Sequence, residues 1–328
     1  MYVLNVRNVH RALPLALQFM DMSDDMVKSD NRVSEAIKCR QPVTTRYDQP
    51  RERVLFWAER NANPFFHLME CLWMMSGRKD VKWISQFNKS FSQFSDDNKT
   101  FHAAYGDRWI NHFHMDQIQV ISEILKKNPL DRRAVLTMWD PNEDLGREGK
   151  DFPCNTQVYF DATHGQLNMT VCCRSNDIVW GAYGANAVHM SFMQEVMASM
   201  IGIPVGVYWQ ISNNWHGYLK TLEPVMSLKD RVEESCPYET GEVSPFPIVN
   251  VEPKIWFEDL DMFMDCGPIT GFRDPFFRRV VTPIYQAWKA KEITEDEYRY
   301  DHALEIMKQC SAQDWKKACT EWLIRNRK

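Results

Sequence analysis

The segment 153–177, PCNTQVYFDATHGQLNMTVCCRSND, predicts two short strands, because β-rich runs fill residues 156–161 and 166–172. Cys154 precedes the first strand, and Arg174 follows the second, 20 residues later. In a hairpin those two ends lie side by side, so we expect a guanidinium beside a thiol. A nearby cation lowers the pKa of a thiol and makes it a nucleophile, whereas Cys154 taken alone would also fit a buried structural thiol.

The rest of the chain mixes helices and strands without strict alternation, which favours an α+β fold over a doubly wound nucleotide-binding fold. Asn63-Pro64, followed by apolar residues up to Met75, predicts a helix that is capped at its start and stopped by Gly77. Further elements are expected as helices over 115–125, 186–201 and from 276 onward, and as strands over 134–139 and 205–211. Neither GxGxxG nor GxxxxGKS/T occurs, so the common phosphate-binding loops are absent.

The composition is that of an ordinary globular chain, with 328 residues, 44% hydrophobic residues and a net charge of −5. This slight acidity disfavours nucleic-acid binding, which relies on a basic surface. Nine cysteines without CxxC spacing indicate reduced thiols, and neither a disulfide framework nor a metal site is expected. No signal peptide and no membrane span are predicted, so we expect a cytoplasmic protein.

Three further polar motifs could carry chemistry. Glu70 has apolar helical neighbours and should lie at the core face, where a carboxylate must be paired or functional, or else at the edge of the apolar stripe. The adjacent Arg132 and Arg133 suit an anion such as phosphate, or form a solvated surface. His216 and Tyr218 follow the strand over 205–211 and offer two hydrogen-bonding side chains on one turn.

Taken in order, these features resemble the thymidylate synthase superfamily. The resemblance covers residues 60–225 and, more loosely, 247–264, and it keeps the family's spacing of 20 residues from cysteine to arginine. It rests on six ordered motifs: Met69-Glu-Cys-Leu-Trp73, Tyr105-Gly-Asp-Arg-Trp109, Asn128-Pro-Leu-Asp-Arg-Arg133, Pro153-Cys154, Arg174-Ser-Asn-Asp177 and His216-Gly-Tyr-Leu-Lys-Thr-Leu-Glu-Pro224.

The resemblance implies a thymidylate synthase-like α+β fold, with a large mixed β-sheet at a dimer interface and helices around it. We expect a catalytic domain over residues 1–265 and a helical C-terminal extension over 266–328 packed on it. The resemblance also implies a homodimer with shared active sites. Its substrates would be a pyrimidine deoxynucleoside monophosphate and the co-substrate methylenetetrahydrofolate, with no part for a membrane or a nucleic acid.

The resemblance also gives roles to the matching residues. Cys154 as thiolate would add to C6 of the pyrimidine and turn C5 into a nucleophile for the one-carbon unit. Glu70 would organise water and proton transfer, with Tyr105 and Asn155 as further catalytic residues. The nucleotide phosphate would be bound by Arg174, Ser175 and the loosely matched Arg32, and by Arg132 and Arg133 from the partner subunit. His216 and Tyr218 would bind the deoxyribose hydroxyl, and Asn186 or Ala185 would read the base. The folate would contact Asp177, Phe91 and Trp73.

Four departures separate the chain from the methylating members. Asn155 stands where they carry histidine, and Phe91 stands where they carry a tryptophan that shields the reaction intermediate. The short apolar C-terminal tail is missing, and Asn186 is displaced by one residue from the usual asparagine position. The string Arg-Ser-Asn-Asp also resembles the phage deoxycytidylate hydroxymethylases, but their base-reading aspartate has no counterpart between Gly181 and Met190.

We therefore expect a phage-type dUMP or dCMP 5-hydroxymethylase, with dUMP preferred. In that reaction water completes the one-carbon transfer and tetrahydrofolate leaves unoxidised. One alternative is a thymidylate synthase, which makes dTMP and dihydrofolate. The other is a non-catalytic paralogue that binds nucleotide or RNA.

Overall fold

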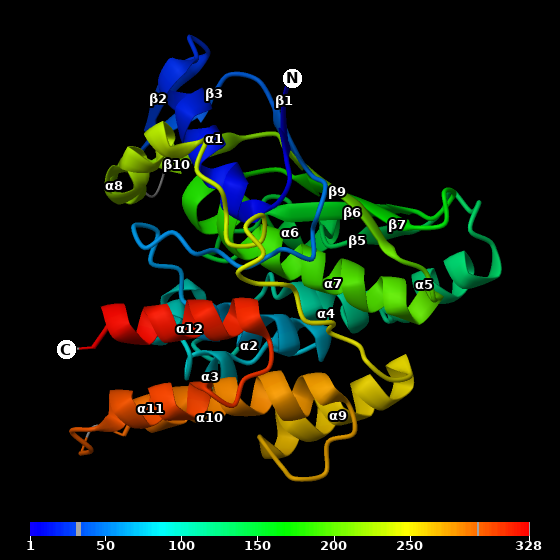
Figure 1. Cartoon of the computed structure of the whole chain (residues 1–328). Coiled ribbons are helices and arrows are strands. Elements are labelled where there is room, and N and C mark those ends of the chain that lie inside the picture. The colour runs from blue at the N-terminus through cyan, green and yellow to red at the C-terminus, as the bar shows by residue number, and fades with distance from the viewer. Residues whose placement is uncertain (31–33, 294, 328) are drawn as a thin grey trace.

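The computed structural model describes residues 1–30, 34–293 and 295–327, and these residues form two β-sheets surrounded by helices (Figure 1). The larger sheet has the order β1-β4-β9-β7-β6-β5, with the strands β1 (Tyr2–Val6), β4 (Val43–Tyr47), β9 (Val205–Ser212), β7 (Leu167–Cys173), β6 (Asn155–Asp161) and β5 (Val135–Thr137). The smaller sheet has the order β2-β3-β10-β8, with the strands β2 (Met26–Asp30), β3 (Glu35–Cys39), β10 (Trp215–Tyr218) and β8 (Asn176–Asp177). Parallel and antiparallel pairs occur in both, so the predicted mixed α+β class is confirmed.

The helices come from all parts of the chain. They are α1 (Val9–Met22), α2 (Pro64–Met75), α3 (Val81–Ile84), α4 (Tyr105–Ile110), α5 (Gln117–Lys127), α6 (Pro141–Asp144), α7 (Asn186–Ile201), α8 (Leu219–Leu222), α9 (Pro253–Cys266), α10 (Thr282–Lys291), α11 (Arg299–Met307) and α12 (Gln313–Arg325), with 3₁₀ or π segments at Lys89–Phe94, Ile178–Ala185, Glu223–Arg231 and Phe277–Val281. The predicted helices over 65–75, 115–125 and 186–201 are confirmed as α2, α5 and α7. Asn63 caps α2 as expected, since its side chain accepts the N–H of Phe66.

Helix α7 lies at the centre of the molecule, between the large sheet and α2. Nearly all of its side chains are buried, as expected for a helix that is apolar on every side. Gln194 fastens it to the sheet by donating to the carbonyl oxygen of Leu167 at 2.8 Å. The N-terminus of α7, at Asn186, is thereby held in a fixed place beside the ends of β6 and β8.

The predicted hairpin is confirmed as β6 and β7, which pair antiparallel with Asn155 opposite Cys173. Just beyond that pair, the N–H of Arg174 donates to the carbonyl oxygen of Cys154 at 2.9 Å. The two ends of the hairpin therefore lie side by side, as their spacing of 20 residues predicts.

The face of the large sheet opposite α7 carries a row of half-exposed and exposed side chains. In register across the strands, this row consists of Val135, Tyr159, Thr170, Trp209 and Arg46. Val135 and Tyr159 are 37% and 42% exposed, although alternate residues on the α7 side are buried. Aromatic and aliphatic side chains thus remain in contact with solvent on this sheet face.

The C-terminal helices α10 and α12 pack against α2, beneath the sheets in Figure 1. The ring of Phe65 lies 5.4 Å from that of Trp288 and 5.7 Å from that of Trp322. The Lys291 ammonium lies over both tryptophan rings, at 3.7 Å and 5.2 Å. The expected C-terminal helices are present as α10, α11 and α12, and the division of the chain into a catalytic domain over 1–265 and an extension over 266–328 stays a prediction. None of the described helices is long and apolar enough to cross a membrane.

Candidate active site

Cys154 lies at the start of β6, half-buried, with Arg174 beside it. The Arg174 Nη2 atom is 3.9 Å from the Cys154 sulfur. Burial raises the pKa of the Cys154 thiol, Arg174 acts to lower it, and Asp151 acts to raise it. The guanidinium is therefore the described group that favours the thiolate in the free enzyme.

The loop before Cys154 is held by hydrogen bonds from two sides. On one side the Tyr105 hydroxyl, at the start of α4, accepts the N–H groups of both Cys154 and Asn155 at 3.1 Å. On the other side Arg174 Nε donates to the carbonyl oxygen of Pro153 at 2.8 Å. The backbone thus positions the Cys154 sulfur, and Tyr105, a predicted catalytic residue, directly holds that backbone.

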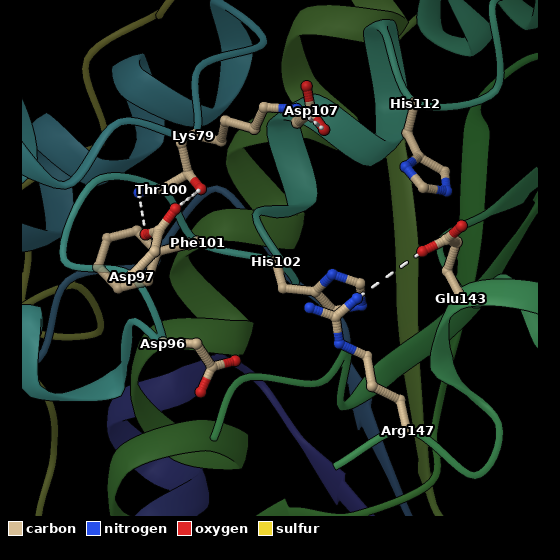
Figure 2. Close-up of a pocket in the computed structure, with 10 residues that line it drawn as sticks. All are labelled: Lys79, Asp96, Asp97, Thr100, Phe101, His102, Asp107, His112, Glu143 and Arg147. Atoms are coloured by element: carbon tan, nitrogen blue, oxygen red, sulfur yellow. Dashed lines mark hydrogen bonds and ion pairs between the residues drawn. The ribbon is translucent and has the colours of Figure 1, made fainter. Parts of the chain in front are cut away.

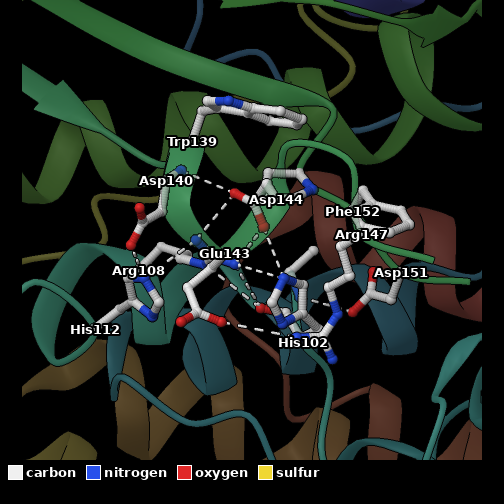
Figure 3. Close-up of polar contacts among 12 residues, drawn as sticks. His102, Arg108, His112, Trp139, Asp140, Glu143, Asp144, Arg147, Asp151 and Phe152 are labelled. Carbon is white, nitrogen blue, oxygen red and sulfur yellow. Dashed lines mark hydrogen bonds and ion pairs between the residues drawn. The ribbon is translucent and has the colours of Figure 1, made fainter. Parts of the chain in front are cut away.

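A buried polar network lies behind this loop (Figure 3). Arg108 and Asp144 are fully buried and form two hydrogen bonds, at 2.9 Å and 3.1 Å. His102 shares Asp144 at 2.7 Å, and Asp151 accepts the N–H of Ala103 at 2.8 Å. The network ties the segment 140–151 to the start of α4, from which Tyr105 projects.

The adjacent surface cleft of about 270 Å³ has charges of both signs (Figure 2). Lys79, Asp96, Asp97, Glu143 and Arg147 project into it, and Lys79 pairs with Asp107 at 3.2 Å. The predicted site residues are not among those that line this cleft.

Asn155 begins a chain of buried side-chain amides, which we call the amide relay. Cys173 Sγ donates to Asn155 Oδ1 at 2.7 Å, Asn155 Nδ2 donates to Asn186 Oδ1 at 3.0 Å, and Asn186 Nδ2 donates to Asn176 Oδ1 at 2.9 Å. Asn176 Nδ2 then donates to Gln210 and to Ser212. With the Cys173 thiol donating at the head of the relay, each of the three asparagines turns its oxygen toward the thiol and its nitrogen away from it.

The segment before Asn186 accounts for the displacement of this asparagine by one residue from the usual position in the family. Residues Ile178–Ala185 form an irregular π-type segment that is kinked at Tyr183 and Gly184, where the backbone angles are not helical, and the N–H of Asn186 donates to the carbonyl oxygen of Gly181, five residues back. A π turn holds one residue more than an α turn, so it absorbs the extra residue. Gly181 is required there, since a Cβ atom would lie 2.7 Å from Asn176 Oδ1 and 3.2 Å from Asn186 Nδ2.

Asp177 lies at the start of the same π turn and accepts the N–H groups of Val179 and Trp180 through Oδ1. Its Oδ2 is buried without a hydrogen-bond partner among the described residues, and burial raises the pKa of this carboxyl. Trp180 is 57% exposed, with the buried Arg60 guanidinium 4.6 Å from its ring centroid. An unpartnered carboxylate oxygen in the turn that also carries an exposed indole suits a flat, N–H-bearing heterocycle. Sequence reasoning missed Trp180 and Arg60.

The other predicted ligands of the nucleotide and the folate fall into two groups. His216 lies in β10 opposite Asp177, and its ring is 5.1 Å from that of Tyr218. Phe91 contacts Phe101 at 4.8 Å, and Trp73 lies behind Phe101 at 6.0 Å. Trp73 is only 2% exposed, so it supports the aromatic cluster from below, and its role toward the folate stays a prediction.

Glu70 is 8% exposed in α2, which confirms that it lies at the core face. Its Oε2 atom is 3.2 Å from the Nε2 atom of His189 in α7. The ring of His67, one turn before Glu70, lies edge-on to that of His189 with centroids 6.1 Å apart. Burial lowers the pKa of His67 well below its usual value, so this imidazole is neutral. Neither histidine was predicted.

The roles of four further predicted phosphate ligands are not tested by the structure. Arg132 and Arg133 are exposed before β5, and Arg133 pairs with Asp131 at 2.7 Å. Ser175 follows Arg174 in the turn and is half-buried. Arg32 lies outside the described residues. All four stay predictions. Within the described ranges, no group of three or more His, Cys, Asp or Glu side chains could hold a metal ion.

A thiol held beside a guanidinium, and followed in the chain by an ordered buried amide, is an arrangement suited to nucleophilic catalysis. The family model described as thymidylate synthase matches residues 20–244. A protein named deoxyuridylate hydroxymethyltransferase from Pseudomonas phage M6 is 48% identical over 335 aligned residues, covering 100% of this chain and 95% of the relative.

Two further relatives cover less of the chain. A protein of the same name from Bacillus phage SP01 is 37% identical over 61% of this chain and 56% of the relative. A putative thymidylate synthase from Methanothermobacter marburgensis is 38% identical over 40% of this chain and 55% of the relative. The chain belongs to the thymidylate synthase family, as its motifs predicted.

Proposed function

We propose that the protein is a dUMP 5-hydroxymethylase that takes its one-carbon unit from methylenetetrahydrofolate. The observation that carries the proposal is the Cys154–Arg174 pair, 3.9 Å apart, in a chain that is 48% identical over its whole length to a protein named deoxyuridylate hydroxymethyltransferase. The phage origin of that relative supports a role in making modified DNA precursors in the host cytoplasm. Retention of the nucleophile argues against a non-catalytic paralogue.

The chemistry begins at Cys154. Its thiolate adds to C6 of the pyrimidine, and the electron pair gained by the ring makes C5 nucleophilic. Arg174 stabilises the thiolate and would share the nucleotide phosphate with Ser175. Tyr105 holds the backbone amides of Cys154 and Asn155, so it keeps the sulfur in line during the reaction.

The amide relay supports uracil as the base. With its Oδ1 turned to Asn155 and its Nδ2 turned to Asn176, Asn186 retains one free N–H and one free lone pair. The N–H matches O4 of uracil, and the lone pair matches the N3–H. Cytosine presents the opposite pattern, so the fixed polarity of the relay favours dUMP.

The surroundings of Asp177 fit the co-substrate. Its unpartnered Oδ2 would accept an N–H of the folate heterocycle, and the exposed Trp180, whose backbone N–H bonds the other oxygen of Asp177, would lie beside it. Phe91 stays a predicted folate contact. When bound, methylenetetrahydrofolate supplies a one-carbon unit at the oxidation level of formaldehyde. Asn155 and Phe91 replace a histidine and a larger indole, which supports room for water near C5 and hence a hydroxymethyl product.

The exposed row on the large sheet supports the homodimer. Trp209, Tyr159 and Val135 would be covered if two sheets packed face to face, and covering apolar surface drives association. Arg132 and Arg133 lie just before β5, at the edge of that sheet. From that position they would reach the phosphate site of the partner subunit.

The test is mass spectrometry of the products formed from dUMP and from dCMP with methylenetetrahydrofolate, together with the absorbance of dihydrofolate. We expect 5-hydroxymethyl-dUMP and no dihydrofolate. Stoichiometric dTMP and dihydrofolate would identify a thymidylate synthase instead, the second candidate, which the putative thymidylate synthases among the relatives favour.

A further inference from the structure

Two buried polar atoms near the amide relay lack hydrogen-bond partners. Glu70 Oε2 and His189 Nε2 lie 3.2 Å apart, yet neither atom forms a hydrogen bond with any described residue. Their residues are only 8% and 4% exposed. Leaving a buried carboxylate oxygen and an imidazole nitrogen unsatisfied is costly, so the two atoms require a third polar group within reach of both.

The Glu70–His189 pair lies close to Asn186, the residue that we propose reads the base. His189 is three residues after Asn186 in α7, so both side chains lie on the same face, one turn apart. Asn186 is bonded to Asn155, the residue after Cys154. The pair is thus placed one helical turn from the amide proposed to read the base.

We propose that His189 is a positioning residue for the water-addition step: its Nε2 and the Glu70 carboxylate together hold the water that attacks the nucleotide. A water molecule is small enough to bond both atoms at once and satisfies them. His67 packs edge-on against His189 and limits rotation of its ring. This inference rests on the proposed function, because only a hydroxymethylase uses this water as a reactant.

The step is an addition followed by an elimination. The water oxygen bonds to the exocyclic methylene carbon on C5, the water proton passes to Glu70, and the electron pair of the C5–methylene double bond moves into the ring. The C5–C6 double bond then forms as the C6–sulfur bond breaks, and its electron pair returns to Cys154 as thiolate. His189 contributes orientation, so its loss should affect this step and spare the preceding ones.

The experiment separates the steps with dUMP tritiated at C5. Tritium release reports the formation of the methylene intermediate, and hydroxymethyl product reports the addition of water. Wild-type enzyme should give the two in a ratio near one. In His189→Leu we expect product to fall by at least about tenfold relative to tritium release, and added 2-mercaptoethanol should capture the methylene as a thioether. His189→Gln, which retains a nitrogen donor near the place of Nε2, should restore most of the product.

The matched control is His10→Leu, which removes another buried histidine, 3% exposed and stacked on Trp57. It should lower stability without changing the ratio of product to tritium. If His189→Leu does not fold, His189→Met carries the same test, because methionine fills irregular spaces. If the ratio of product to released tritium stays near one in the folded apolar variant, the role of His189 is wrong and the proposed function still stands. Wild-type enzyme that makes dTMP would overturn this role and the proposed function together.

Discussion

If Asn186 reads the base, as we propose, the amide relay makes base selection depend also on Asn155, which holds Asn186 by a hydrogen bond. Asn155→Asp would set a carboxylate oxygen against Asn186 Oδ1, where the present amide donates a hydrogen at 3.0 Å. The repulsion is relieved if the side-chain amides of Asn186 and Asn176 both turn over, so that an N–H of Asn186 faces the new carboxylate and its oxygen faces Nδ2 of Asn176. The turned amide offers the base the pattern that matches cytosine.

The magnitude follows from the bonds that hold Asn186. In the wild type, turning this amide alone would forfeit two buried hydrogen bonds, at 3.0 Å and 2.9 Å. Each contributes about 0.5–1.5 kcal/mol, so the wrong orientation costs about 1–3 kcal/mol. This corresponds to a preference for dUMP of about 5-fold to 140-fold over dCMP from orientation alone.

The assay is the ratio of kcat/KM for dUMP to that for dCMP, with both nucleotides in one reaction. Damage to the shared chemistry cancels in this ratio. Asn155→Asp should lower it by at least about fivefold. Cys173→Ser is the matched control, because a hydroxyl still donates at the head of the relay and should leave the ratio unchanged. If Asn155→Asp keeps the ratio within about twofold of the wild type, the relay does not set specificity.

Three other predictions follow from the site and its support. Burial raises the pKa of the Cys154 thiol and Arg174 lowers it, so kcat/KM should rise with pH as the thiolate forms, and Arg174→Gln should move this rise to higher pH. An unshifted pH profile would exclude the electrostatic role of Arg174. Mixing Arg133→Ala chains with Cys154→Ser chains should restore about a quarter of wild-type activity, and no recovery from chains that still dimerise would exclude shared sites. Asp144→Ala removes the carboxylate that pairs with the fully buried Arg108, so it should lower the free energy of unfolding, measured by denaturant titration, by about 3–5 kcal/mol. A loss of less than about 1 kcal/mol would contradict this prediction.

The parts of the fold that sequence reasoning predicted are those with local signals. Asn63 and Pro64 begin α2 because capping and proline geometry act within one turn. Cys154 and Arg174 meet because a single hairpin joins them, so counting residues was sufficient. Glu70 could be placed at the core face from its own helical neighbours alone.

The rest depends on packing between distant segments. The amide relay joins side chains from β6, β8, β9 and α7, whose registers no local pattern specifies. His189 was passed over because a histidine within an apolar helix has no distinctive signal until Glu70, more than a hundred residues earlier, lies beside it. Strands β1 and β4 were likewise missed, since their pairing links the chain start to residues some 40 positions later.

The π turn before Asn186 has a consequence for comparing this chain with its relatives. In a regular helix each residue advances about 100° around the axis, so adding or deleting one residue before α7 would present a different side chain to the base. Under the proposed role of Asn186, the residue that reads the base depends on the length of the segment from Asp177 as much as on its amino acids. A search for an asparagine at a constant distance from Asp177 would find Ala185 here and would pass over Asn186, the residue that we propose reads the base. Redesign of specificity at this position should vary loop length together with residue type.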